Sequence, residues 1–141
     1  MFRILLPVGS DEKQALSASK IITSLPDPSG NVEVTILNVV KKVEATDEGP
    51  KVSSKEWYDE SNFPESAIRA QEYLQDEGLH VELRREHANP KSAIIETAEE
   101  IDADRIVMTG RKRSPSGKVL FGSLIQSVML NSDIPVTVSL K

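Results

Sequence analysis

Residues that could bind an anion are concentrated between positions 106 and 130. The apolar run Ile-Val-Met-Thr ends at Gly110, and Gly122 and Ser123 precede a second apolar run. Glycine lets a backbone approach a phosphate group closely, and the exposed N–H groups at the start of a helix supply hydrogen-bond donors. The segment therefore predicts a strand, a loop and a helix that bind an anion between them, with Ser123 as the helix N-cap or as a ligand.

The loop of this segment carries four cations, although the net charge of the chain is −5: Arg111, Lys112, Arg113 and Lys118. Their clustering is local and favours phosphate as the bound group. The alternative interpretation is that glycine turns and solvated basic side chains occur in any α/β protein. The loop is not a Walker A motif, which needs four residues between its glycines, because six separate Gly110 from Gly117.

The composition indicates one ordinary domain spanning residues 1–141. Cysteine is absent, which excludes disulfides, thiolate metal sites and cysteine nucleophiles. The acidic balance argues against a nucleic-acid binder, and no apolar run has the length of a signal peptide or a membrane span. His80 and His87 show no metal-ligand spacing. We therefore expect a cytoplasmic protein that binds no nucleic acid, membrane or metal.

Apolar strand-like runs alternate with segments of helical periodicity along most of the chain. Pro64, Gly78 and the Asn89–Pro90 pair mark helix ends, Gly30 and Asn31 predict a turn, and the polar residues 41–61 predict a long exposed loop. This alternation predicts a mostly parallel sheet with helices on both faces. The expected strands are 2–8, 32–40, 79–84, 106–109 and 134–140, and the expected helices begin at Ser10, Pro64, Pro90 and Ser123.

The position of a ligand site follows from this topology. Ligands of open doubly wound sheets bind beyond the carboxyl ends of the strands, where the winding reverses. If the first and fourth strands are central neighbours, the loop at Gly9 faces the loop between Gly110 and Gly122. Val39, at the end of the second strand, would complete one wall of a nucleotide-sized crevice.

In the order and spacing of its motifs the chain resembles the universal stress protein family. The resemblance implies an open, doubly wound, five-stranded parallel sheet of order 3-2-1-4-5, and a homodimer formed through the last strand, residues 134–140. Members of the family divide into kinds that bind ATP, with Mg²⁺, and kinds that do not. The motifs are Leu6–Val8, Thr35–Val40, Asn89–Pro90, Asp104–Gly110, Gly122–Ser123 and Pro135–Val138.

The resemblance also implies which residues would hold the nucleotide. Val8 and Gly9 end the first strand, and Gly9 stands where the family pattern has an acid that helps to hold the nucleoside. The backbone of Val39 matches the position that meets adenine. In the phosphate loop, which is one residue shorter than the family pattern, Gly110, Gly122 and Ser123 match, Arg113 replaces the second glycine, and Gly117, Arg111 and Lys118 are candidates to compensate.

The leading hypothesis is a regulatory module that binds ATP at the ends of the first and fourth strands. No general base or nucleophile is placed for catalysis, because Asp11 and Glu12 are explained by the dipole of the helix that they begin. The alternative is a dimeric stress-response protein that binds an unknown protein partner and no nucleotide. A phosphoacceptor receiver domain lacks its clustered acids here, and a nucleotide hydrolase is a weaker alternative.

Overall fold

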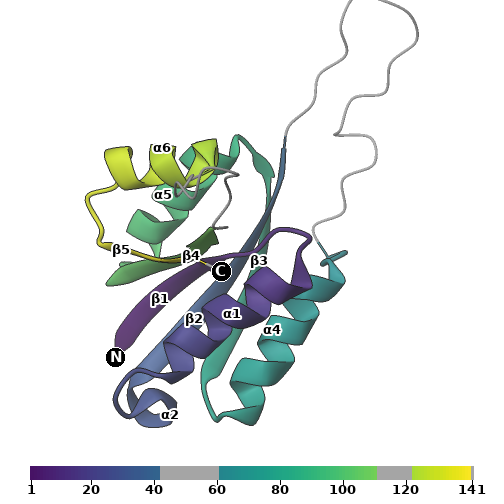
Figure 1. The fold of residues 1–141 in the computed structure, drawn as a ribbon, viewed down its shortest axis with the longest axis vertical. Coiled ribbons are helices and arrows are strands. Elements are labelled where there is room, and N and C mark those ends of the chain that lie inside the picture. Colours follow the sequence, from purple (N-terminus) through teal and green to yellow (C-terminus); the bar gives the residue numbers. More distant parts are fainter. Residues whose placement is uncertain (42–60, 111–121, 141) are drawn as a thin grey trace, which may run out of the picture.

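The computed structural model describes residues 1–41, 61–110 and 122–140, and these form a five-stranded parallel sheet (Figure 1). The strand order is β3-β2-β1-β4-β5, so the predicted order 3-2-1-4-5 is confirmed. Ile4 pairs with Val34 in the centre of the sheet, and Ile106 pairs with Val136 near one edge. The strands are β1 (Phe2–Pro7), β2 (Val32–Lys41), β3 (His80–Ala88), β4 (Arg105–Gly110) and β5 (Val136–Leu140).

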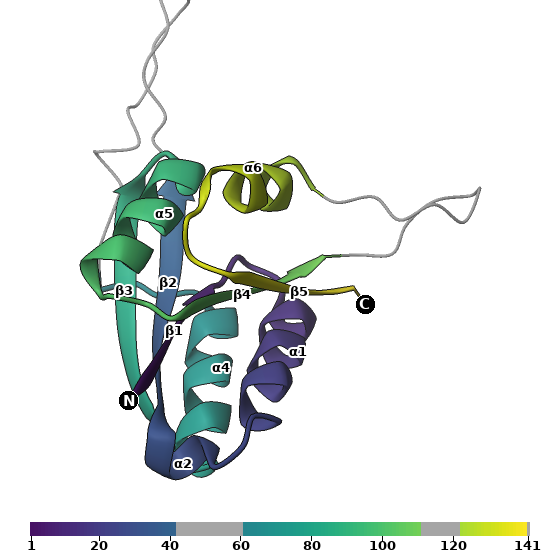
Figure 2. The same ribbon diagram turned by 90° about the vertical axis from the view of Figure 1, so that its left-hand side faces the viewer.

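Helices cover both faces of the sheet, as Figure 2 shows. One face is covered by α1 (Glu12–Thr23) and α4 (Glu65–Asp76), and the other by α5 (Pro90–Glu100) and α6 (Ser123–Asn131). Successive side chains of a strand point to opposite faces. Ile4 and Leu6 of β1 therefore pack in the core beneath α1 and α4, whereas Leu5 packs beneath α5 and α6. The predicted doubly wound class is confirmed.

The N-cap residues of two helices differ from the predictions. Asp11, not Ser10, is the N-cap of α1, and its Oδ1 accepts a hydrogen bond of 3.1 Å from Gln14 N–H. Gly122, not Ser123, is the N-cap of α6, so the prediction of Ser123 as a cap is wrong. The prediction at α5 is confirmed, because Asn89 Oδ1 accepts from Ser92 N–H at 3.2 Å.

Two further elements were predicted incompletely. Residues 28–31 form a single helical turn, α2 (Pro28–Asn31), where only a turn at Gly30 was expected. Strand β3 continues to Ala88 and pairs with β2 along its whole length. Gly78 has a φ of 88°, the left-handed conformation expected after α4. The loop predicted at 41–61, apart from its two end residues, lies outside the described residues.

The two edges of the sheet carry different side chains. Edge strand β3 is charged, and its Arg84 forms ion pairs with Glu86 at 2.8 Å and with Glu100 of α5. The hydrogen bond to Glu86 raises the pKa of Arg84 above its ordinary value. The other edge strand, β5, has the uncharged sequence Val-Thr-Val-Ser-Leu. Neither edge of the described sheet is covered by a further strand.

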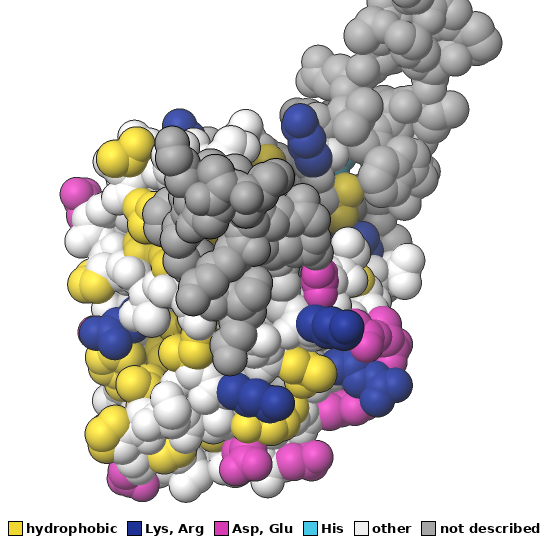
Figure 3. Space-filling view, in the orientation of Figure 1, with side chains coloured by type: hydrophobic (Ala, Val, Ile, Leu, Met, Phe, Trp, Pro, Cys, Tyr) yellow, Lys and Arg dark blue, Asp and Glu magenta, His cyan; other side chains and the backbone are white. Residues whose placement is uncertain are grey.

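Exposed apolar side chains are also found on α6, the helix that precedes β5. Leu124, Met129 and Leu130 of α6 are all exposed, Leu130 by 82%. In Figure 3, hydrophobic surface lies on the side of α6 and β5, whereas charged side chains of both signs lie over α1 and α4. In the part of the chain that the structure describes, no helix has the length and apolar character needed to cross a membrane.

Candidate functional site

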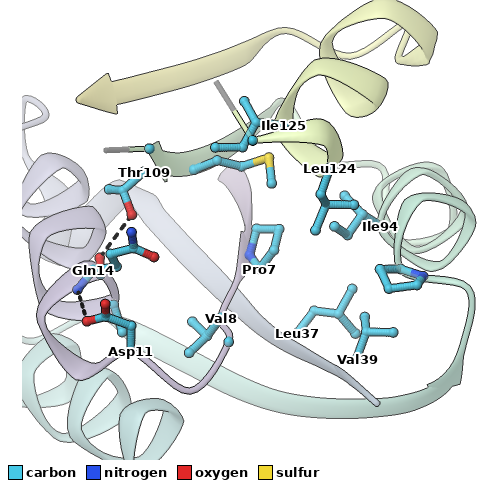
Figure 4. Close-up of a pocket in the computed structure, with 16 residues that line it drawn as sticks. Pro7, Val8, Asp11, Gln14, Leu37, Val39, Ile94, Thr109, Leu124 and Ile125 are labelled. Carbon is cyan, nitrogen blue, oxygen red and sulfur yellow. Dashed lines mark hydrogen bonds between the residues drawn. The ribbon is translucent and has the colours of Figure 1, made fainter. Parts of the chain in front are cut away.

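A cleft of about 560 Å³ opens at the carboxyl ends of β1 and β4 (Figure 4). The cleft lies where the winding of the sheet reverses, because the chain moves outward from β1 to β2 and β3 and then returns to β4 on the other side. Its volume is within the range of small-molecule sites. The lining residues are Pro7, Val8, Gly9, Asp11, Gln14, Ala15, Leu37, Val39, Pro90, Ile94, Met108, Thr109, Gly110, Gly122, Leu124 and Ile125.

The structure brings five of the ten predicted site residues into this cleft: Val8, Gly9, Val39, Gly110 and Gly122. Ser123 begins α6 with an exposed side chain and is not among the lining residues. A Cβ atom added at Gly9 or at Gly122 would meet no described atom within 4 Å. Open space therefore lies beside both backbones. Arg111, Arg113, Gly117 and Lys118 lie outside the described residues.

One wall of the cleft is apolar. It is formed by Leu37 and Val39 of β2, Ile94 of α5 and Leu124 of α6, whose side chains point into the same space in Figure 4. Leu37 and Ile94 also belong to the buried core of this face. Leu37 lies in a predicted strand and Ile94 in a predicted helix, but no pattern in the sequence indicated that they border a cavity. Such a wall can contact a flat, weakly polar ring on its face.

The opposite wall carries the polar side chains that sequence reasoning did not assign to the site. Asp11 is the N-cap of α1 and also lines the cleft, so the same side chain that begins the helix is also placed to contact a ligand. Thr109 Oγ1 donates to Gln14 O at 3.3 Å and ties the end of β4 to the first turn of α1 (Figure 4). The only signal in the sequence was that Asp11 follows the first strand closely.

The arrangement suits binding more than catalysis. Asp11 is the carboxylate among the lining residues, and its Oδ1 already accepts from Gln14 N–H. Among the described residues, no three His, Asp or Glu side chains are grouped to hold a metal ion. A magnesium ion would then depend on phosphate oxygens of a ligand for most of its coordination, as this ion does in many nucleotide sites.

The fold and the cleft define an α/β protein with a cleft at the switch point of a doubly wound parallel sheet. The comparison with family models assigns it more narrowly. The model of the universal stress protein family matches residues 1–139, and the chain belongs to this family. The predicted resemblance is confirmed.

Solved structures share the fold over nearly the whole chain. A universal stress protein from Archaeoglobus fulgidus is 25% identical, with a TM-score of 0.73 and coverage of 98% of both chains. A universal stress protein from A. fulgidus in complex with dAMP is 20% identical, with a TM-score of 0.68 and coverage of 98% of this chain and 97% of that one. A universal stress protein family protein from Arabidopsis thaliana with AMP bound is 12% identical, with a TM-score of 0.64 and coverage of 100% of this chain and 92% of that one. No match was found among curated proteins.

Proposed function

We propose that this protein is a regulatory module that binds ATP in the cleft between the ends of β1 and β4. The observation that carries the proposal is the composition of the cleft, where an apolar wall faces a polar one and the backbones of Gly9, Gly110 and Gly122 are exposed to it. The base would lie against Leu37 and Val39. The phosphates would lie near Gly110 and Gly122, where the start of α6 offers N–H donors. Relatives of the same fold were solved with dAMP and AMP bound, which supports an adenine nucleotide.

The geometry gives no reason to propose hydrolysis. A hydrolase needs a group that activates water within hydrogen-bond reach of the phosphate. Asp11 is engaged at the start of α1, on the polar wall, whereas Gly122, the N-cap of α6, lines another part of the cleft. The proposed role is therefore regulatory binding of a nucleotide without its hydrolysis.

Calorimetric titration with ATP and Mg²⁺ tests this proposal, after mass spectrometry has shown whether nucleotide co-purifies. We expect a dissociation constant in the micromolar range, which corresponds to about −8 kcal/mol. The Gly122→Val variant is the negative control, because a branched side chain would occupy the open space beside this backbone. An absence of binding to wild type at millimolar ATP would contradict the proposal.

The second candidate is a homodimer that recruits a protein partner, and the β5 edge favours it. The edge is uncharged, it is open in the described sheet, and exposed Met129 and Leu130 lie on α6, the helix that precedes β5. An edge strand of this kind can pair with the same strand of a second copy.

Replacing Val138 with proline tests the edge directly. Pro135 O accepts from Ile106 N–H, so the next N–H, that of Val136, points to the open edge, and alternation places Val138 N–H there too. Val138→Pro should therefore remove an outward donor without removing a β4–β5 hydrogen bond. By light scattering, we expect this variant to be monomeric and Val138→Ile to be dimeric. A monomeric wild type would contradict the dimer.

A further inference from the structure

Two consecutive carbonyl groups in the loop after β1 accept hydrogen bonds from buried polar side chains of β2 and α4. Asn38 Nδ2, on β2, donates to Val8 O at 3.0 Å, and Ser66 Oγ, on α4, donates to Gly9 O. Asn38 is 7% exposed and Ser66 is 1% exposed. Polar groups at such positions stabilise a fold less than apolar ones unless they are fully hydrogen-bonded. Both side chains bind backbone groups of residues that line the cleft, Val8 and Gly9.

The orientation of the Asn38 amide is itself fixed. Arg85 Nε, on β3, donates to Asn38 Oδ1 at 3.0 Å, and Arg85 Nη1 donates to Asn62 O just before α4. A guanidinium is always a donor, so it selects the oxygen of the amide and turns the Nδ2 group toward Val8 O. A series of hydrogen bonds through Arg85 and Asn38 therefore connects Asn62, just before α4, with Val8, which lines the cleft.

These contacts determine the direction of the Gly9 N–H group. Val8 N–H donates to Leu37 O at 2.8 Å and Val8 O accepts from Asn38, so both polar groups of Val8 point toward β2. In a trans peptide the C=O and the following N–H point in opposite directions, and the described residues contain no cis peptide. The Gly9 N–H therefore points away from β2, toward the side of β1 where β4 lies.

On that side lies the cleft, which Gly9 and Gly110 both line. Among the described residues, the Gly9 N–H has no hydrogen-bond acceptor. The Gly9 carbonyl is turned toward α4 by Ser66, so it does not present an acceptor in place of this donor. An outward N–H on a fixed backbone is pre-organised to donate to a ligand.

We propose that Asn38 and Ser66 are positioning residues that hold the Gly9 N–H toward the cleft as a donor to an oxygen atom of the bound nucleotide. The proposal rests on the nucleotide-binding function proposed above. The oxygen belongs either to the sugar or to a phosphate group, and the two sources are separated by comparing adenosine with ATP. Arg85 contributes indirectly, by fixing the amide of Asn38.

The test is an NMR titration, in which the amide chemical shifts of ¹⁵N-labelled protein are recorded as Mg²⁺-ATP or, separately, adenosine is added. We expect the Gly9 amide proton to shift strongly with ATP. A shift with adenosine as well assigns the acceptor to the sugar, and a shift with ATP alone assigns it to a phosphate. Titration calorimetry of Ser66→Ala and Asn38→Ala should give ATP dissociation constants raised about fivefold, the effect of one weakened hydrogen bond.

Ser19→Ala is the matched control, because Ser19 is equally buried and its Oγ donates at 2.8 Å to Ala15 O within α1, not to the loop. Its ATP affinity should equal that of wild type even if its melting temperature falls as much as that of Ser66→Ala. Wild type that binds ATP without movement of the Gly9 amide, or Ser66→Ala that binds as tightly as Ser19→Ala, would overturn the proposal. Wild type that binds no ATP would instead reject the proposed function. If Asn38→Ala does not fold, Ser66→Ala decides alone.

Discussion

The two faces of the sheet are each covered by two helices, but they are closed to different degrees. Beneath α1 and α4, large side chains such as Ile22 and Leu74 are fully buried. Beneath α5 and α6, apolar residues such as Ile94 and Met108 contribute both to the core and to the wall of the cleft. On α6, Leu124 remains 37% exposed. The same type of apolar pattern thus completes a core on one face and leaves a binding surface on the other.

The largest expected effect is on the closed face. Leu74→Ala removes a fully buried side chain from beneath α4, and we expect the free energy of unfolding to fall by about 2–5 kcal/mol. Urea denaturation measures this loss. ATP affinity of the folded variant should be unchanged, because Leu74 does not line the cleft. A loss below about 1 kcal/mol would show that this face is not tightly packed.

Gly122→Val should produce the opposite combination. The added side chain enters open space, so the free energy of unfolding should change by no more than about 1 kcal/mol, the effect of a poorer N-cap. ATP binding should weaken by about 100-fold, or about 3 kcal/mol, because the phosphate is kept from the backbone. Gln126→Val, an exposed change on the same helix, is the control and should bind ATP normally. Equal affinities of the two variants would place the phosphates elsewhere.

Leu124→Ala is the same chemical change as Leu74→Ala, made on the open face, and it should have the smallest effect on stability. Since Leu124 is already partly exposed, we expect a loss below about 1 kcal/mol in urea denaturation. ATP affinity should fall about threefold, because the ligand loses an apolar contact in the cleft. A loss of stability as large as that of Leu74→Ala would mean that the two faces do not differ.

Much of the fold could be predicted because strand and helix patterns alternate clearly, and parallel connections have one preferred hand. Local boundaries were harder where neighbouring residues compete. Ser10 and Asp11 are both good N-caps, and only the hydrogen bond to Gln14 shows that Asp11 is used. The extension of β3 to Ala88 comes from pairing with β2, which overrides a sequence too charged to predict a strand.

The candidate site was predictable where it depends on backbone and topology. Gly9, Val39 and Gly110 come together because the ends of β1, β2 and β4 meet at one end of the sheet. Ile94 and Leu37 were not foreseen as cleft residues, because a side chain that lines a cavity and one that fills a core have the same periodicity. Asn38 and Ser66 were missed because their partners are distant backbone carbonyls, which no local pattern reveals.

The unlike edges of the sheet have a consequence for assembly. If two copies join through β5, each presents β3 as its outer strand, with the ion-paired Arg84 and several other charges along it. A charged edge is a poor template for a further strand. The sheet can therefore be extended in one direction and once only, so such an assembly would stop at a closed pair with twofold symmetry and would not grow into a filament.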